Sequence, residues 1–180
     1  MNKLSINNVE KSVIEDAFIV SLNTFSDLRG ENFECFNQCE YDKIFETSQR
    51  WKNEAPKFLI DSFSKSRYSV LRGFHGDENT WKLIQCLEGE IQFCIIDLRK
   101  DSSSFEKYEI FHLNDKEKKQ ILVPRGCVNA HLCLSEKCLF HYKLTHAYVE
   151  QEKQFHVKWD NPKFKIDWKI KNPVLSPRDT

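Results

Sequence analysis

Residues 82–98 read Lys-Leu-Ile-Gln-Cys-Leu-Glu-Gly-Glu-Ile-Gln-Phe-Cys-Ile-Ile-Asp-Leu. Two apolar runs, 82–87 and 90–98, flank the pair Glu88 and Gly89. Runs rich in Ile, Leu and Phe suit the pleated surface of a β-sheet. Because a glycine-containing pair between two strands is typical of a tight turn, this stretch predicts a β-hairpin.

Similar short runs recur along the chain, separated by turn residues, at 17–22, 32–36, 58–60, 69–74, 108–113, 120–123, 128–134 and 138–145. Helical periodicity is weaker and favours one amphipathic helix over 41–51 and a shorter one over 149–155. Many short strands with few helices predict an all-β fold, a jelly-roll barrel with a few short peripheral helices. A length of 180 residues fits a single domain over 1–180.

The charges exclude several classes of partner. Lysine and arginine together number 27, and so do aspartate and glutamate. A net charge of zero leaves no electrostatic footprint for nucleic acid or an anionic membrane, so local basic groups must bind any anionic ligand. The N-terminus lacks an apolar signal core and no long apolar run follows, so we expect no membrane span and a cytoplasmic protein.

The seven cysteines are odd in number and mostly lie inside apolar runs, which favours reduced core residues. Cys35 and Cys39 form a C-x3-C pair without a second pair at zinc-finger distance. The sequence therefore predicts no zinc site there.

The first chemical motif is Arg-Gly-Phe-His-Gly at 72–76, followed by Lys82. Strand alternation places Arg72 and Phe74 on one face and His75 on the other. A lone histidine in a strand is more often structural. Arg72 and Lys82 lie close in the sequence, and these neighbouring cations favour a catalytic role for His75 instead. A neutral imidazole suits proton abstraction, and an ammonium stabilises the oxyanion that forms beside a ketone.

The second motif is Ile-Leu-Val-Pro-Arg-Gly-Cys-Val-Asn-Ala-His at 121–131. The pair of motifs resembles that of the cupin superfamily, whose metal-dependent members take two His and one Glu from the first motif and one His from the second. Here His75 stands alone, and Asn129 occupies the position of the second-motif histidine, with His131 two residues on. We therefore expect neither a metal nor a cofactor.

Further short motifs follow one another along the chain, at 27–34, 64–75, 82–84, 88–91, 97–105, 142–148, 159–160, 166–168 and 175–179. In order and spacing, from Phe18 to Asp179, these motifs resemble those of the dTDP-4-dehydrorhamnose 3,5-epimerase family, which acts on nucleotide-linked 4-keto sugars. The resemblance implies that His75 removes a proton next to the 4-ketone and that Asp179 orients the imidazole. Lys82 would stabilise the enolate, and Tyr142 would return a proton to the opposite face.

The resemblance also implies a nucleotide diphosphate sugar as substrate and a homodimer in which an N-terminal strand reaches across to the partner. The residues expected to bind substrate are Arg29, Glu34, Ser62, Arg72, Asn129 and Arg178. A bidentate guanidinium suits phosphate oxygens, which assigns the arginines to the diphosphate.

Several positions depart from the family pattern. Asn129 replaces a histidine, Ile60 and Ser62 replace a Gln-x-Asn pair, and Ala147 replaces an aromatic residue. These changes leave open whether the substrate is a GDP-4-keto-heptose or a dTDP-4-keto-6-deoxyhexose of bacterial surface polysaccharide biosynthesis. They also leave open whether C3, C5 or both are inverted.

Two other classes compete with an epimerase. A cupin 3,4-ketoisomerase of nucleotide sugars usually has further histidines beside the first, whereas Gly76 and Asp77 follow His75 here. A non-catalytic sugar-binding cupin would have lost the base, the lysine or the acid, and this chain retains all three.

Overall fold

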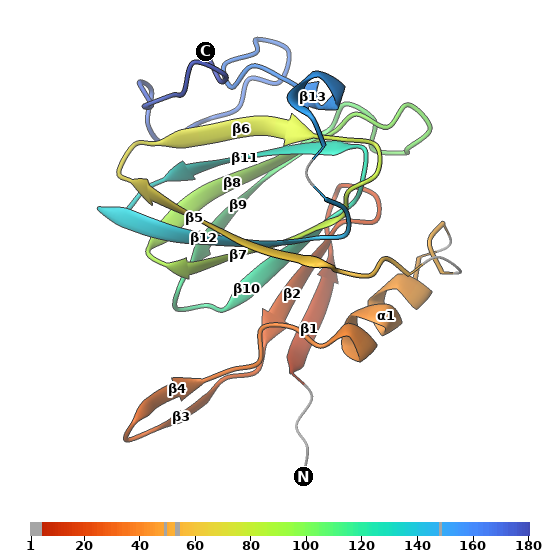
Figure 1. Ribbon diagram of the computed structural model, residues 1–180, viewed down its shortest axis with the longest axis vertical. Helices are drawn as coiled ribbons and strands as arrows, with labels where there is room; N and C mark the ends of the chain where they lie inside the picture. Colours follow the sequence, from red (N-terminus) through yellow and green to blue (C-terminus); the bar gives the residue numbers. More distant parts are fainter. Residues whose placement is uncertain (1–4, 49, 53–54, 148) are drawn as a thin grey trace.

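The structure is a computed structural model that describes residues 5–48, 50–52, 55–147 and 149–180, and two antiparallel sheets face each other in it (Figure 1). The six-stranded sheet has the order β1 (Ile6–Lys11), β2 (Phe18–Leu22), β10 (Lys119–Val123), β7 (Lys82–Glu88), β12 (Lys137–Leu144), β5 (Ile60–Arg67). The five-stranded sheet has the order β13 (Phe155–His156), β6 (Leu71–Gly76), β11 (Cys127–Cys133), β8 (Glu90–Asp97), β9 (Tyr108–Asn114). The predicted all-β jelly roll is confirmed.

The hairpin predicted at Glu88 and Gly89 is wrong. Strand β7 pairs with β10 and β12, whereas β8 pairs with β9 and β11, so the turn carries the chain from one sheet to the other. Gly89 has a φ of +80°, and a Cβ there would lie 2.2 Å from the carbonyl oxygen of Lys137. The turn was recognisable from its glycine, but the pairing partners of the two strands were not.

Other boundaries also differ. The helix expected over 41–51 is α1 (Gln38–Glu46), which begins early because the Asn37 side chain accepts a hydrogen bond from the Cys39 amide. The strand expected over 32–36 ends at Asn32, in a small hairpin of β3 (Phe25–Asp27) and β4 (Gly30–Asn32). The helix expected over 149–155 is one 3-10 turn, η1 (Gln151–Lys153). Within the described ranges, no helix is long and apolar enough to cross a membrane.

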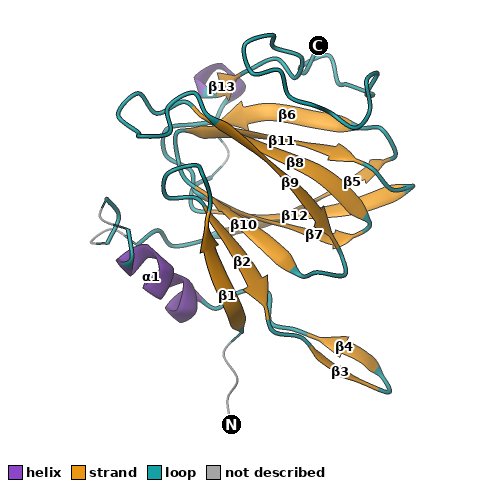
Figure 2. Cartoon of the chain, turned by 180° about the vertical axis from the view of Figure 1, so that it is seen from behind, coloured by secondary structure: helices purple, strands orange, loops and turns teal. Residues whose placement is uncertain are grey.

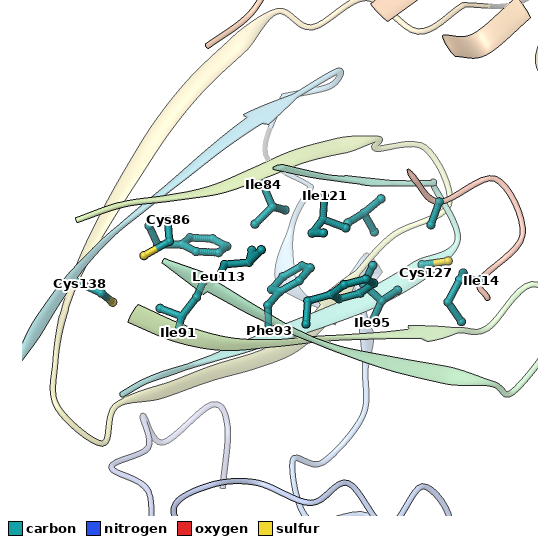
Figure 3. Close-up of a cluster of buried hydrophobic side chains, with 14 of the residues drawn as sticks. Ile14, Ile84, Cys86, Ile91, Phe93, Ile95, Leu113, Ile121, Cys127 and Cys138 are labelled. Atoms are coloured by element: carbon teal, nitrogen blue, oxygen red, sulfur yellow. The ribbon is translucent and has the colours of Figure 1, made fainter. Parts of the chain in front are cut away.

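The main core lies between the two sheets, where side chains of β7 and β10 meet those of β8 and β9 (Figure 3). Two further apolar clusters cover the outer faces. Helix α1 packs on the outside of β2, β7 and β10, and the C-terminal segment with Phe164 and Trp168 packs on the outside of β6, β8 and β11 (Figure 2). Both faces of β8 are therefore buried, which explains its continuous apolar run.

Strand β6 does not alternate as the sequence predicts. Arg72 pairs with His131 and His75 pairs with Asn129, with a register shift between the two pairs. Since directly opposed residues share a face of a sheet, Arg72 and His75 lie on the same side. Phe74 faces the other way and is fully buried in the outer cluster. The expected separation of Arg72 from His75 is wrong, because the shift adds a residue between them.

The first prediction concerns Gly73, where the shift occurs. Its φ is +118°, and an added Cβ would lie 2.5 Å from the Asn129 carbonyl oxygen and 2.7 Å from the Ala130 Cβ. Gly73→Ala should lower the free energy of unfolding by roughly 2–5 kcal/mol, through strain plus overpacking. Gly30→Ala is the control, because Gly30 has a φ of +121° with nothing within 4 Å. Equal losses in chemical denaturation for the two variants would show that the close approach costs nothing.

Candidate active site

A cavity of about 250 Å³ opens between the two sheets. Strand β11 contributes Asn129 and His131 to its lining, and β7 and β12 contribute Lys82 and Tyr142 from the opposite wall. Arg72 of β6 also lines it. Four of the predicted site residues therefore meet in one space, although they come from positions spread over the sequence.

His75 and Asp179 form a close pair beside this cavity. The imidazole Nε2 lies 2.7 Å from the Asp179 Oδ1, and the aspartate side chain is only 4% exposed. The aspartate is fixed by Ser176, whose hydroxyl donates a 2.9 Å hydrogen bond to Oδ2. The segment before it is held at the edge of β6, where the Leu71 amide donates to the Val174 carbonyl. The docked tail thus presents a buried carboxylate to the imidazole.

The pKa of Asp179 lies below its ordinary value. Burial raises that pKa, but the contacts with His75 and Ser176 outweigh the burial. The carboxylate is therefore ionised at neutral pH and able to hold a proton on the imidazole nitrogen that faces it.

Lys82 connects the pair to the cavity. Its Nζ donates hydrogen bonds to the His75 carbonyl at 2.9 Å and to the Asn129 Oδ1 at 2.6 Å. An ammonium has three donors, so one remains for a ligand oxygen. Burial lowers the pKa of Lys82 to about 8, and Asp77 counteracts part of that effect. Lys82 is thus mostly cationic at neutral pH, and its charge is lost as pH rises through about 8.

His131, noted in the sequence only for its place two residues after Asn129, also lines the cavity. It is 3% exposed, and its ring stacks on Phe140 with 3.9 Å between centroids. Burial lowers its pKa to about 3, and the charge of Arg72 adds to the effect, so His131 is neutral. It therefore offers hydrogen bonds without charge beside Arg72.

The remaining predicted residues are placed less centrally. Arg178 donates to the Gln154 Oε1 at 2.7 Å, and Gln154 lines the cavity. Ser62 pairs with Tyr142 across β5 and β12 but is not among the residues that line the cavity. The sequence motif that ends at Tyr148 extends beyond the described residues.

Arg29 and Glu34 are not brought into this cavity. Arg29 lies in the connection between β3 and β4, which projects away from the barrel, and its guanidinium pairs with Asp27 (Figure 1). Glu34 accepts a hydrogen bond from the Asn37 side chain at 3.2 Å. The expectation that they bind substrate is therefore untested within a single chain.

The sequence gave no role to His156. It lies in β13 directly opposite His75, and the two rings lie 5.8 Å apart between centroids with 28° between their planes. Nothing in the local sequence signals this, because the contact depends on the pairing of a two-residue strand with the edge of β6.

The arrangement suits one class of chemistry. His75 lies on the five-stranded sheet, whereas Lys82 and Tyr142 lie on the six-stranded sheet. Side chains capable of proton transfer therefore come from both sheets, which is what an epimerase needs to invert a stereocentre.

The chain is similar in sequence and structure to known epimerases. Residues 11–180 match the family model described as dTDP-4-dehydrorhamnose 3,5-epimerase. The enzyme of that name from Shigella flexneri is 34% identical over 175 residues, covering 96% of this chain and 92% of its own. The crystal structure of dTDP-4-dehydrorhamnose 3,5-epimerase from Elizabethkingia anophelis superposes with a TM-score of 0.86 at 31% identity, covering 98% of this chain and 94% of its own.

A second structure, the dTDP-6-deoxy-D-glucose-3,5-epimerase of Legionella pneumophila in complex with dTDP-4-keto-L-rhamnose, gives a TM-score of 0.86 at 28% identity. It covers 96% of this chain and 89% of its own. The chain belongs to the dTDP-4-dehydrorhamnose 3,5-epimerase family, and its barrel is the cupin-like jelly roll of those enzymes.

The second prediction concerns the charge of Lys82. As pH rises through about 8, Lys82 loses its proton. The role that the family resemblance implies for Lys82, stabilising an enolate oxygen, requires the charged form. The rate of sugar proton exchange should fall on the alkaline side with an apparent pKa near 8. Lys82→Arg should be slower but should lose this alkaline limb, because a guanidinium stays charged. Lys143→Arg is the control, since Lys143 pairs with Asp61 and does not line the cavity. An unchanged alkaline limb in Lys82→Arg would assign the titration to another group.

Proposed function

We propose that this chain inverts C3, C5 or both in a nucleotide-linked 4-keto sugar by removing and returning a proton. The observation that carries the proposal is that His75 and Tyr142 lie on opposite sheets, with Tyr142 and Lys82 lining the cavity and Lys82 donating a hydrogen bond to the His75 carbonyl. The 4-keto group acidifies the neighbouring C–H bonds, so a side-chain base is sufficient for the first step.

His75 acts as the base in this proposal. Asp179 faces Nε2 at 2.7 Å and holds a proton there, which leaves the Nδ1 lone pair to accept the proton from carbon. The same carboxylate then stabilises the imidazolium. Because Asp179 is buried and bound to Ser176, the imidazole is oriented before substrate arrives.

Lys82 stabilises the negative charge that develops on the 4-keto oxygen. Two of its N–H groups bind His75 and Asn129, and the third can donate to that oxygen. Tyr142 donates a proton from the opposite wall. Its ring packs against Phe140 with 5.5 Å between centroids, which fixes its position on β12. Protonation from that wall completes the inversion.

The nucleotide carrier is either thymidine diphosphate, as the names of the relatives state for those proteins, or guanosine diphosphate. The second carrier is supported by Ser62 and Ala147, which depart from the family pattern near the nucleotide. Arg72 and Arg178 are the cations that we assign to the diphosphate. We place the reaction in the cytoplasm, in keeping with seven free cysteines.

The third prediction tests the base and the acid in deuterium oxide. With a 4-keto sugar linked to dTDP or GDP, the wild-type chain should introduce deuterium at C3, C5 or both, as measured by mass spectrometry and NMR. His75→Asn should slow exchange by about 10²–10⁴-fold, whereas Tyr142→Phe should retain exchange and lose inversion.

His112→Asn and Tyr68→Phe are matched controls, because His112 and Tyr68 are exposed and outside the cavity. Absence of deuterium with every dTDP- and GDP-linked substrate would defeat the proposal. Wild-type exchange by His75→Asn would show that another group is the base.

We further propose a homodimer in which the β3–β4 hairpin of one subunit supplies Arg29 and Glu34 to the site of the other. The hairpin projects from the barrel, Leu28 at its tip is 100% exposed, and Phe25 is 52% exposed (Figure 1). An exposed hairpin with apolar side chains favours contact with another chain, and twofold dimers are the commonest assembly.

The fourth prediction follows from this exchange. Arg29→Ala and His75→Asn should each be inactive alone, but refolding them together should restore about one quarter of wild-type activity, because half of the dimers are mixed and each has one intact site. Mixing His75→Asn with Tyr142→Phe is the control, since no pairing repairs the inversion in either site. If the mixture of Arg29→Ala and His75→Asn recovers no activity, Arg29 does not contribute to the active site of the partner subunit.

A further inference from the structure

A second histidine, His156, lies beside the pair of His75 and Asp179 and has no part in the proposed proton transfers. One ligand atom each from His75, His156 and Asp179 lies within 4.8 Å of the other two. The three residues come from β6, β13 and the C-terminal segment, so the fold brings them together. His75 belongs to the first cupin motif, but His156 and Asp179 lie outside both motifs, and Asn129 stands in place of the second-motif histidine.

We propose that these three side chains form a binding site for a divalent transition ion of the zinc class, and that the bound ion switches the epimerase off. Two imidazoles and one carboxylate are a donor set that suits Zn²⁺, Co²⁺, Ni²⁺ and Cu²⁺ and that disfavours Mg²⁺ and Ca²⁺, which prefer oxygen ligands. The proton transfers proposed above use no metal.

The geometry requires movements of about 1 Å. A tetrahedral ion with bonds of about 2.1 Å places its ligand atoms about 3.4 Å apart. A separation as wide as 4.8 Å must therefore close by about 1.4 Å, and the 2.7 Å pair of His75 and Asp179 must open by about 0.7 Å. His156 is exposed and lies in a two-residue edge strand, so its ring can move inward. The ion would enter between the His75 Nε2 and the Asp179 Oδ1, which now lie 2.7 Å apart.

The carboxylate is prepared for this role by its neighbours. Ser176 binds one oxygen of Asp179, at 2.9 Å, and leaves the other oxygen facing the imidazole. Hydrogen bonds that fix a ligand raise metal affinity, because less order must be created on binding. The cross-strand pairing of His156 with His75 fixes the third ligand in register.

Metal binding and proton abstraction exclude each other. A metal on Nε2 of His75 leaves the proton on Nδ1, and a metal on Nδ1 occupies the lone pair directly. In either case the imidazole has no free lone pair for the sugar C–H. The ion also takes the Asp179 oxygen that would stabilise the imidazolium. A bound ion therefore removes the base without disturbing the cavity.

The fifth prediction is tested first without substrate. Calorimetric titration of the full chain with ZnCl₂ should show one site per chain, CoCl₂ should give the visible absorption of a nitrogen-ligated Co²⁺ ion, and MgCl₂ should give neither. His156→Asn should weaken Zn²⁺ binding by at least about tenfold, since it removes one of three ligands. His112→Asn and Cys39→Ser should bind as wild type, which excludes an exposed histidine and an exposed thiol elsewhere.

The effect on rate rests on the proposed function and is measured separately. Zn²⁺ should slow deuterium exchange by the wild-type chain at least about tenfold, and a chelator should restore it. His156→Asn should exchange at the wild-type rate and resist Zn²⁺, because His156 takes no part in the proton transfers. Full-affinity Zn²⁺ binding by His156→Asn, or unchanged exchange in zinc-loaded wild type, would overturn the inference. If no sugar supports exchange, the proposed function fails, while the binding measurements still decide the metal site.

Discussion

The close approach of β6 to β11 at Gly73 is the contact on which the geometry of the site depends. Without a side chain at this position, the Asn129 carbonyl and Ala130 come within distances that a Cβ would block. The accompanying register shift turns Arg72 and His75 to the same side, toward the residues of β11 that line the cavity. It also turns Phe74 outward, where its ring packs against Trp168 with 5.9 Å between ring centroids. One irregularity thus serves the site and the packing of the C-terminal cover.

Electrostatics in the site follow from burial more than from overall charge. The chain is neutral, yet its cavity is lined by Arg72 and Lys82. His131 lies beside them and stays uncharged, because burial and Arg72 both oppose its protonation. The site therefore combines the permanent charge of Arg72 with neutral hydrogen-bonding groups. The burial that shapes the cavity also brings the pKa of Lys82 to about 8, so this second charge depends on pH.

The sequence predicted much of the secondary structure and little of the pairing. Apolar runs such as 108–113 and 120–123 became β9 and β10 almost unchanged, because the core lies on at least one face of each. The turn at Gly89 was visible, but its passage between sheets was not, because a glycine turn fits either connection. For α1, the cap formed by Asn37 decided the start, and the apolar pattern alone did not reveal it.

The site residues were likewise predictable from motifs in part, while the contacts that depend on strand pairing were not. His75, Lys82, Tyr142 and Asp179 were named from motifs, and the structure brings His75 to Asp179 and places Lys82 and Tyr142 on the cavity; the roles of these residues stay predictions until they are measured. His156 had no assigned role and His131 was noted only for its place near Asn129, because their surroundings depend on which strands lie opposite them. The expected face of Arg72 was wrong, since strict alternation cannot foresee a register shift.

The docked C-terminal segment has a consequence for how the protein loses activity. Asp179 lies beyond Phe164 and Trp168, the buried residues of the C-terminal segment, and is held by Ser176, by His75 and by the short bridge between Val70 and Val174. The barrel is held by two sheets and two other apolar clusters. Local opening of a weakly held segment requires less free energy than global unfolding. The tail can therefore detach while the barrel stays intact. Warming should then inactivate the protein reversibly, below its melting temperature, in a state that spectroscopy of the β-sheets would still report as folded.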